Sequence, residues 1–303
     1  MTIVAGVDAG GSRTVAVIGD LSGSELGRST GAHANAATSG PSAAAATIAA
    51  TVRNALDQTA FAAPIASLVV GAAGAGRDRH RDALHAALAE QQIAQKLQVT
   101  TDAAVALESA FPAALGVVLI AGTGSIAYAR DPAGEVCRVG GHGPRFGDDG
   151  SGFSLARGAI GAALRAHEGR GPATVLEHAL WAATATESNG DFQEWIEQAG
   201  TDQVAGLAEA VCNAADGGDE VAVSLVRDAG RSLADHVVAL LPRFDHRNSV
   251  QVALHGGLIV PDTAVRRVLL TELATRAPAV EVCGGAVDPA SGALRLAVQA
   301  LRT

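Results

Sequence analysis

The sequence predicts an α/β fold of two similar domains, each a mixed sheet with crossover helices. Strand-like apolar runs alternate with helical periodicity along most of the 303 residues, which is the pattern of crossover connections. The opening arrangement of three short strands recurs in the second half, which indicates a duplicated domain. Hydrophobic residues make up 48% of the chain and charged residues 17%, so each domain can form a core.

The first half begins with three strands joined by tight turns at 10–11 and 20–23. Ile48, Val52 and Leu56 then recur every four residues, which predicts one face of a helix. The expected elements are strands at 2–8, 13–19, 24–30, 65–71 and 97–101, and helices at 42–58, 78–91 and from Asp102 onward.

The stretch 116–139 repeats this opening. Its turn at 122–124 takes the place of 10–12, and 131–134 takes the place of 20–23. Ten residues separate the first glycine of one turn from the aspartate of the next in the first copy, and nine in the second. The remaining expected elements are a helical insertion at about 151–241, strands at 250–254 and 279–283, and helices at 262–275 and 289–301.

These elements predict a domain at 1–114 and a second at 115–288 that carries the helical insertion. The last helix, within 289–303, is expected to pack back on the first domain. A cleft between two similar domains is a natural ligand site, so we expect the ligands there.

Composition excludes several classes of function. The net charge of −9 argues against a nucleic-acid surface, which needs clustered Lys and Arg. The apolar stretch 113–129 is interrupted by glycines and makes a poor membrane span. Cys137, Cys212 and Cys283 form no CxxC pair, which favours neither a zinc site nor a disulfide framework. We expect a reduced, cytoplasmic protein without a secretory signal.

Asp8 stands where the first strand ends, and small flexible residues follow it. Glycine permits a ligand to approach the backbone closely. One interpretation is a β-hairpin turn with a polar residue at its mouth. The other is a phosphate-binding loop in which Asp8 faces Mg²⁺. This stretch alone favours the hairpin.

The second glycine turn favours the phosphate-loop interpretation over the plain hairpin. Two such turns at equivalent places could grip a polyphosphate from both sides with backbone N–H groups. Asp8 would hold Mg²⁺ through water, because magnesium releases its water reluctantly. The residues expected to bind the nucleotide phosphates are Gly10, Gly11, Ser12, Thr14, Gly122, Thr123 and Gly124.

Four motifs occur in order along the chain: "GVDAGGSRT" at 6–14, "TTDAA" at 100–104, "IAGTGS" at 120–125 and "GGHGPRFGDDGSG" at 140–152. With the late "HGGL" at 255–258, they resemble the BadF/BadG/BcrA/BcrD ATPase family and its N-acetylglucosamine kinases. The resemblance implies two ribonuclease H-like domains of the actin-like ATPase type, with ATP and Mg²⁺ as cofactors. It also implies an amino sugar as substrate, and relatives of this kind are often homodimers.

Asp102 opens a helix directly after a strand. Its plainer role is to cap that helix. In the kinases that the chain resembles, the aspartate of this motif accepts the proton of the attacking sugar hydroxyl. A carboxylate suits this role because the hydroxyl becomes acidic only as it bonds to phosphorus. With the other motifs present, we favour Asp102 as the general base, with capping as an additional role.

The resemblance also implies the residues that bind the sugar and the nucleoside. Asp148 would accept hydrogen bonds from two adjacent hydroxyls, and the segment 144–146 departs from the family pattern. The other histidines show no metal-binding spacing, and most are expected at the surface. The implied sugar-binding residues are Asn35, Asp102, His142, Gly143, Pro144 and Asp148, and Gly256 and Gly257 would lie against the adenine or ribose.

The predicted function is therefore ATP-dependent phosphorylation of an amino sugar, with N-acetylglucosamine to its 6-phosphate as the expected reaction and glucosamine as another substrate. The alternative is an ATPase activator of a 2-hydroxyacyl-CoA dehydratase or benzoyl-CoA reductase system. Such activators bind an iron–sulfur cluster through cysteines. Here Cys137 is expected within a strand, Cys212 on a helix and Cys283 at a strand end, which does not favour such a site. A non-catalytic actin-like module would not need Asp102 or a polar sugar loop.

Overall fold

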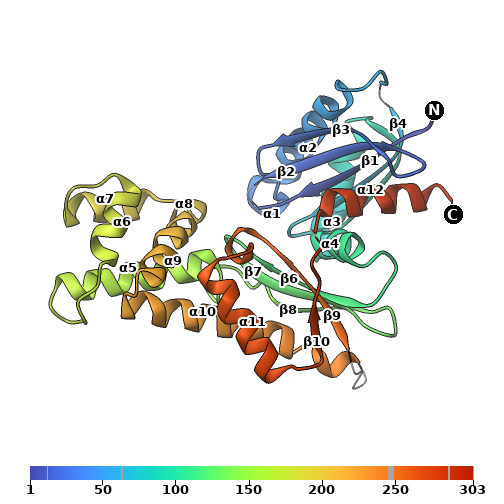
Figure 1. Ribbon diagram of the computed structural model, residues 1–303. Coiled ribbons are helices and arrows are strands. Elements are labelled where there is room, and N and C mark those ends of the chain that lie inside the picture. The colour runs from blue at the N-terminus through green and yellow to red at the C-terminus, as the bar shows by residue number, and fades with distance from the viewer. Residues whose placement is uncertain (12, 63, 245–248, 286, 303) are drawn as a thin grey trace. The chain divides into compact units, whose positions relative to one another are not determined.

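The computed structural model describes residues 1–11, 13–62, 64–244, 249–285 and 287–302. The chain divides into two compact units (Figure 1). Unit 1 comprises Met1–Ala114 together with Gly285–Thr303, and unit 2 comprises Leu115–Gly284. Unit 1 is therefore assembled from both ends of the chain.

Unit 1 is built on a five-stranded sheet in the order β3-β2-β1-β4-β5. The first three strands are antiparallel, and β1, β4 and β5 are parallel. The strands are β1 (Ile3–Ala9), β2 (Thr14–Asp20), β3 (Glu25–Gly31), β4 (Ile65–Ala72) and β5 (Ala94–Thr101). The helices are α1 (Ala36–Ser39), α2 (Pro41–Leu56), α3 (Asp78–Ala89), α4 (Asp102–Ala110) and α12 (Pro289–Ala300).

Unit 2 has a five-stranded sheet in the order β10-β9-β6-β7-β8. Its strands are β6 (Gly116–Ala121), β7 (Ser125–Arg130), β8 (Val136–Gly140), β9 (Val250–His255) and β10 (Val280–Val282). Its helices are α5 (Gly152–His167), α6 (Leu176–Thr184), α7 (Asn189–Gln198), α8 (Thr201–Gly206), α9 (Ala208–Asp216), α10 (Glu220–Val238) and α11 (Ala264–Arg276). Short 3₁₀ turns are η1 (Leu241–Phe244) and η2 (Gly257–Ile259).

The two sheets have the same topology. In each, the first strand lies in the centre, two antiparallel neighbours lie on one side and two parallel strands lie on the other. This repetition confirms the predicted fold class of two duplicated mixed sheets with crossover helices. Strand boundaries in the described part agree with the predicted ones to within one to three residues, because glycine turns and apolar runs mark them locally.

Both faces of the unit 1 sheet are covered. Side chains alternate along β1, so Ala5 and Val7 pack with the core of α2, while Val4 packs with α12 and α4. Gly6 lies on the α12 face, and a Cβ there would overlap the backbone of Leu294. Helix α12 therefore lies directly against β1, and its first turn is near the end of the strand that carries Asp8.

The structure adds detail that periodicity did not predict. Strand β5 begins at Ala94, three residues before the expected start, in a segment with exposed side chains. The short helix α1 was not expected. In the described part, the insertion consists of the six helices α5 to α10, where the sequence predicted only one helical region. Among the described residues, no helix combines the length and the apolar character needed to span a membrane.

Candidate functional site

Asp8 lies at the C-terminal end of β1, where the turn to β2 begins. The Gly10 N–H donates to the Arg13 carbonyl at 3.0 Å and closes this turn. An added Cβ on Gly11 would meet no described atom within 4 Å, so a ligand could reach its backbone. Ser12, which the sequence also assigns to phosphate binding, lies outside the described residues.

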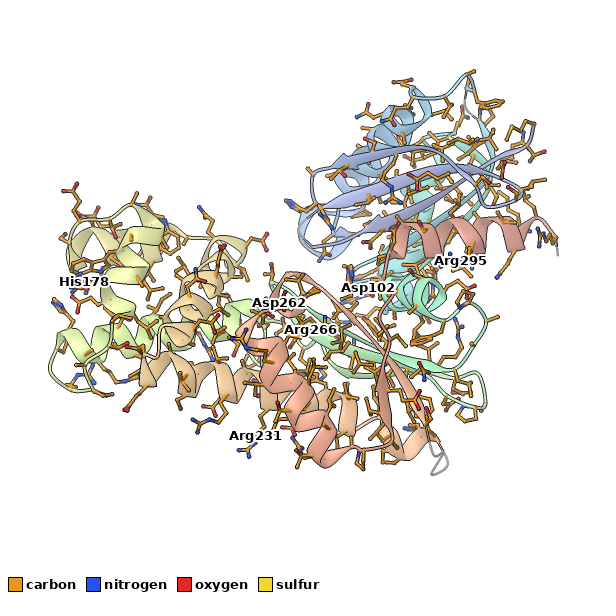
Figure 2. The ribbon with its side chains drawn as sticks, viewed as in Figure 1. Asp102, His178, Arg231, Asp262, Arg266 and Arg295 are labelled. Carbon is orange, nitrogen blue, oxygen red and sulfur yellow. The ribbon has the colours of Figure 1, made fainter. Side chains whose placement is uncertain are left out.

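Parallel strand pairing brings Asp8 and Asp102 to the same edge of the unit 1 sheet. Asp8 is level with Gly71 in β4, and Gly71 is level with Thr100 in β5. Asp102 begins α4 directly after β5 (Figure 2). Gly71 has no room for a side chain, because a Cβ there would overlap Val105 of α4. The two carboxylates thus stand on either side of a strand end that carries no side chain.

The first turn of α4 shows how Asp102 is held. The hydroxyl of Thr101 accepts a hydrogen bond from the Ala104 N–H at 3.2 Å, so Thr101 is the N-cap. The expectation that Asp102 caps the helix is therefore wrong; Asp102 is the first residue inside it. Its Oδ1 accepts from the Ala103 N–H at 2.9 Å. The carboxylate lies at the helix N-terminus, where the helix dipole stabilises negative charge.

The electrostatics of this edge favour a cation. Burial and, next in size, the nearby Asp102 carboxylate raise the pKa of Asp8 from 3.8 to about 7. The guanidinium of Arg13 acts in the opposite direction, and Asp288 at the start of α12 adds to the rise. A divalent cation beside Asp8 would relieve this repulsion between carboxylates.

The residues present fit Mg²⁺. The described residues contain no group of three or more His, Cys, Asp or Glu side chains that could hold a metal ion. Magnesium, however, keeps several waters and commonly takes one or two carboxylates together with phosphate oxygens. Asp8 would supply the carboxylate, and the charge of Asp102 beside it would add to the attraction of the cation. The Thr14 Oγ1, which the sequence assigns to phosphate binding, is buried without a hydrogen-bond partner in the described part of the chain. Thr14 shares a face of β2 with Ala16 and Ile18, which pack against α2.

In unit 2 the equivalent turn follows β6. The Gly122 N–H donates to the Gly124 carbonyl at 2.9 Å, and the Gly152 N–H donates to the Gly122 carbonyl at 2.8 Å. The loop that ends at α5 is thereby attached to this turn. The Thr123 hydroxyl, expected to bind phosphate, donates to Asp202 at 2.9 Å. Because the Thr123 hydroxyl is already engaged, the backbone N–H groups of this turn are better placed than the hydroxyl to bind a ligand.

Asp148 is the buried carboxylate of this loop. Its backbone is left-handed, with φ 58°, a strained conformation that is often associated with function. Its Oδ1 accepts from the Gly143 N–H at 3.1 Å, and a Cβ at Gly124 would come within 2.8 Å of its Oδ2. Burial raises the pKa of Asp148, while the Gly143 N–H, His142 and His236 oppose the rise. The loop therefore places Asp148 against the glycine turn.

The sequence did not predict the burial of His236. Most histidines outside the loop were expected at the surface, but His236 is buried, and its Nδ1 donates to the Ser232 carbonyl at 2.7 Å. Its Nε2 faces Gly140, where a Cβ would overlap the ring. His236 follows Leu233 by three positions on the apolar face of α10, a spacing that could have revealed its burial.

Gly256 and Gly257 reach the same sheet edge as the 122–124 turn. Strands β9 and β6 are parallel, with His255 level with Ile120. Gly256 has φ 109°, and a Cβ there would overlap the Ala121 backbone. Gly257 has no described atom within 4 Å of an added Cβ. The structure therefore brings this pair beside the turn, as a nucleotide site would need.

The remaining predicted residues occupy loops. Asn35 precedes α1, and its carbonyl accepts from the Ser39 N–H at 2.9 Å. His142 is exposed, and Pro144 is half-buried. Phe146, in the segment that departs from the family pattern, is 90% exposed. This side chain therefore takes no part in the core.

A sequence model of the BadF/BadG/BcrA/BcrD ATPase family matches residues 5–297. The chain belongs to this family. The match covers both sheets, the two glycine turns and α12, so the predicted resemblance is confirmed over nearly the whole chain.

Similar proteins from this group have been named as sugar kinases. An N-acetylmuramic acid/N-acetylglucosamine kinase of Clostridium acetobutylicum is 31% identical over 64% of this chain and 64% of that protein. An N-acetyl-D-glucosamine kinase of Dictyostelium discoideum is 28% identical over 98% of both chains. The solved structure of a protein from Chromobacterium violaceum, provisionally named an N-acetylglucosamine kinase, is 28% identical, with a TM-score of 0.82 over 98% of this chain and 99% of that one.

Proposed function

We propose that this chain transfers the γ-phosphoryl group of ATP to a hydroxyl of an amino sugar. N-acetylglucosamine is the expected substrate, and its 6-phosphate is the expected product. Membership of an ATPase family supports ATP as the phosphoryl donor. The relatives named as N-acetylglucosamine kinases support a sugar as the acceptor.

The observation that carries the proposal is the pair of carboxylates at one edge of the unit 1 sheet. Asp8 and Asp102 interact electrostatically, and Gly71 leaves the strand end between them without a side chain. Phosphoryl transfer needs charge neutralisation at the phosphates and a base at the attacking hydroxyl. Two carboxylates with different surroundings can divide these tasks.

Each carboxylate has a proposed role. Asp8 would hold Mg²⁺ through water, and the bound metal would supply charge neutralisation at the β- and γ-phosphates. Asp102 would accept the proton of the sugar hydroxyl as the new bond to phosphorus forms. Its place at the start of α4, with one oxygen held by the Ala103 N–H, would keep the carboxylate oriented for that transfer.

The loop of unit 2 is proposed to bind the sugar. Asp148 would accept hydrogen bonds from adjacent hydroxyls, and the backbone from His142 to Pro144 would line the ring. Asn35 is proposed as a further sugar-binding residue. The glycines of the two turns, and Gly256 with Gly257, would contact the nucleotide. A hydrogen bond to a charged group contributes more than one between neutral groups, so Asp148 should dominate the sugar affinity.

Asp148→Asn should weaken N-acetylglucosamine binding by roughly 10- to 100-fold, because a charge-assisted hydrogen bond contributes about 1.5–3 kcal/mol. Asparagine keeps the side-chain shape and tolerates a left-handed backbone. Calorimetric titration with the sugar measures the change. Asp149→Asn, at the exposed neighbouring position, is the matched control and should bind like the parent protein. Equal affinity in both variants would remove Asp148 from the sugar site.

A coupled assay of ADP release tests the proposed function. The purified protein with Mg·ATP is offered N-acetylglucosamine, glucosamine and N-acetylmuramic acid, with glucose for comparison. We expect ADP release that depends on an amino sugar, and ³¹P NMR of the product should show phosphate on the oxygen of carbon 6. ADP release that no sugar stimulates would contradict the proposal. No observation favours the activator function: Cys137 lies in β8, Cys212 is buried in α9 and Cys283 follows β10.

A further inference from the structure

Helix α12 lies against both elements that carry the two carboxylates. Gly6 of β1 has no room for a Cβ beneath Leu294. Gly292 is equally confined, because a Cβ there would overlap the Val105 carbonyl of α4. Val105 follows Asp102 by one helical turn, and Gly6 precedes Asp8 by two residues on the same face of β1. Small residues therefore bring α12 into backbone contact on both sides.

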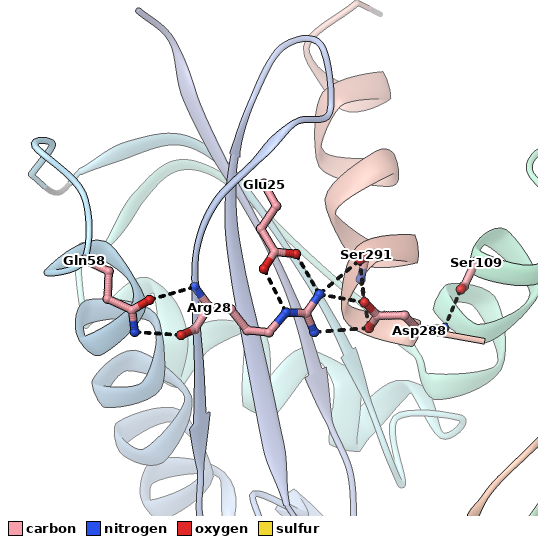
Figure 3. A network of polar contacts seen from close by, with 6 residues as sticks. All are labelled: Glu25, Arg28, Gln58, Ser109, Asp288 and Ser291. Atoms are coloured by element: carbon pink, nitrogen blue, oxygen red, sulfur yellow. Dashed lines mark hydrogen bonds and ion pairs between the residues drawn. The ribbon is translucent and has the colours of Figure 1, made fainter. Parts of the chain in front are cut away.

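A polar network fastens the first turn of α12 (Figure 3). Asp288, the N-cap of α12, forms an ion pair with Arg28 of β3 at 2.6 Å. Arg28 is itself held by Glu25, with Nη2 to Oε2 at 2.8 Å. The Asp288 N–H donates to the Ser109 hydroxyl of α4 at 2.8 Å. The start of α12 is thus tied to the sheet on one side and to α4 on the other.

Arg295 adds a second attachment between the two helices. Its Nη2 donates to the carbonyls of Glu108 and Ser109, at 3.1 and 2.9 Å, in the last turn of α4. A cation at the C-terminal end of a helix complements the helix dipole. Gln299 also donates to the buried Glu108 at 3.2 Å. Figure 2 shows Arg295 on α12 and Asp102 at the start of α4.

The Arg295 attachment is expensive in free energy. Its Nε is buried without a hydrogen-bond partner in the described part of the chain, and an unsatisfied buried donor costs about 1–3 kcal/mol. An apolar side chain of similar length would avoid that cost while still packing between the helices. The arginine therefore fixes the position of α4 at a cost in stability.

We propose that α12 sets the separation of Asp8 and Asp102, and that Arg295 is a positioning residue which acts through α4. Asp102 and Glu108 lie at opposite ends of this short helix, so a shift of its last turn moves its first residue as well. The inference rests on the proposed function in one respect. It assumes that the cation beside the two carboxylates is Mg²⁺, bound together with a nucleotide phosphate.

Magnesium-dependent binding of ADP tests the positioning role of Arg295 without any turnover. Calorimetry gives the dissociation constant of ADP with Mg²⁺ and with a chelator, and their ratio reports how strongly Asp8, with the charge of Asp102 beside it, attracts the metal. Arg295→Met should reduce this ratio by about 10-fold, the lower end of the losses seen when groups that orient metal ligands are removed. Metal-free ADP affinity should stay unchanged. Arg295→Lys keeps the charge and should restore most of the ratio.

Lys96→Met is the matched control. Lys96 donates to the Ala300 carbonyl at the opposite end of α12, so its loss also removes a bond to this helix but far from the carboxylates. The ratio should stay at the parent value. Ser109→Ala, which removes the hydroxyl that accepts from Asp288, replaces Arg295→Met if that variant does not fold, and should also lower the ratio.

An unchanged ratio in folded Arg295→Met, or in Ser109→Ala where Arg295→Met does not fold, would overturn the proposal and leave α12 with a purely structural role. A parent protein whose ADP affinity does not rise with Mg²⁺ would overturn it as well. A parent protein that binds Mg·ADP but phosphorylates no amino sugar would contradict the proposed function alone, and the ratio would still decide the role of Arg295.

Discussion

Asp102→Asn should abolish phosphoryl transfer, with turnover reduced by ~10²–10⁴-fold, the usual contribution of a general base. The amide keeps the shape of the carboxylate and can still accept from the Ala103 N–H, a bond of 2.9 Å in the parent protein. It cannot take the proton of the sugar hydroxyl. Thr101 remains as the N-cap, so α4 should stay folded.

Single-turnover kinetics with saturating Mg·ATP and sugar would measure the loss, and calorimetry would show that the sugar still binds. Asp78→Asn is the matched control, since Asp78 is also the first residue of a helix in unit 1. It should leave turnover unchanged. Turnover of the Asp102 variant within a few-fold of the parent would remove Asp102 from the mechanism and leave it only a local role in α4.

Asp8→Asn should have two opposite effects: loss of Mg·ATP use and a gain in stability. The carboxylate is the proposed metal contact, so nucleotide affinity should lose its dependence on Mg²⁺. Without metal, however, the buried charge is unfavourable, because burial and Asp102 raise the pKa of Asp8 to about 7. The variant removes that charge.

The sign of the pH dependence follows from linkage. Between about pH 4 and pH 7 the folded protein retains a proton on Asp8 that the unfolded chain has released, given the pKa change from 3.8 to about 7. The free energy of unfolding therefore falls as pH rises through this window. Above it Asp8 is fully ionised, and the loss of stability caused by its buried charge is complete. Asp8→Asn should gain little at pH 4 and at most roughly 4 kcal/mol at pH 8.

Urea unfolding with a chelator present, at pH 4 and pH 8, measures this difference. Asp20→Asn is the contrasting variant at the end of β2. Hydrogen bonds from Ser22 lower the pKa of Asp20, so its carboxylate stabilises the folded state above its usual pKa, and its loss should not stabilise the protein at pH 8. Equal gains for Asp8→Asn at both pH values would show that Asp8 carries no buried charge.

The fold could be predicted because its signals are local. Apolar runs that end in Gly10 or Gly122 define strand ends, since few other residues adopt turn conformations as readily. The repeated opening at 116–139 predicted two similar sheets, and the motif "TTDAA" placed Asp102 at a strand-to-helix junction. The same local signals placed Asp8 and Asp102, because both candidate site residues lie at strand ends.

The N-cap of α4 and the burial of His236 could not be predicted. The first depended on which of two suitable side chains caps the helix, and the second on residues distant in the sequence. Both Thr101 and Asp102 are good capping residues, and only the geometry of α4 shows that Thr101 caps it. His236 was expected at the surface because the histidines outside the loop sit among Ala, Arg and Glu on probable helices and loops, yet its ring packs against Gly140.

The sequence by itself determined the two duplicated sheets, the glycine turns and the strand ends that carry Asp8 and Asp102. These follow from periodicity and backbone preference, which act over a few residues. Only the tertiary structure decided what surrounds the two carboxylates. Arg28 and Asp288 are 260 residues apart, and Arg295 meets carbonyls 186 and 187 residues away. An apolar face predicts that a helix is buried, but steric fit and long-range polar contacts decide against which elements it packs.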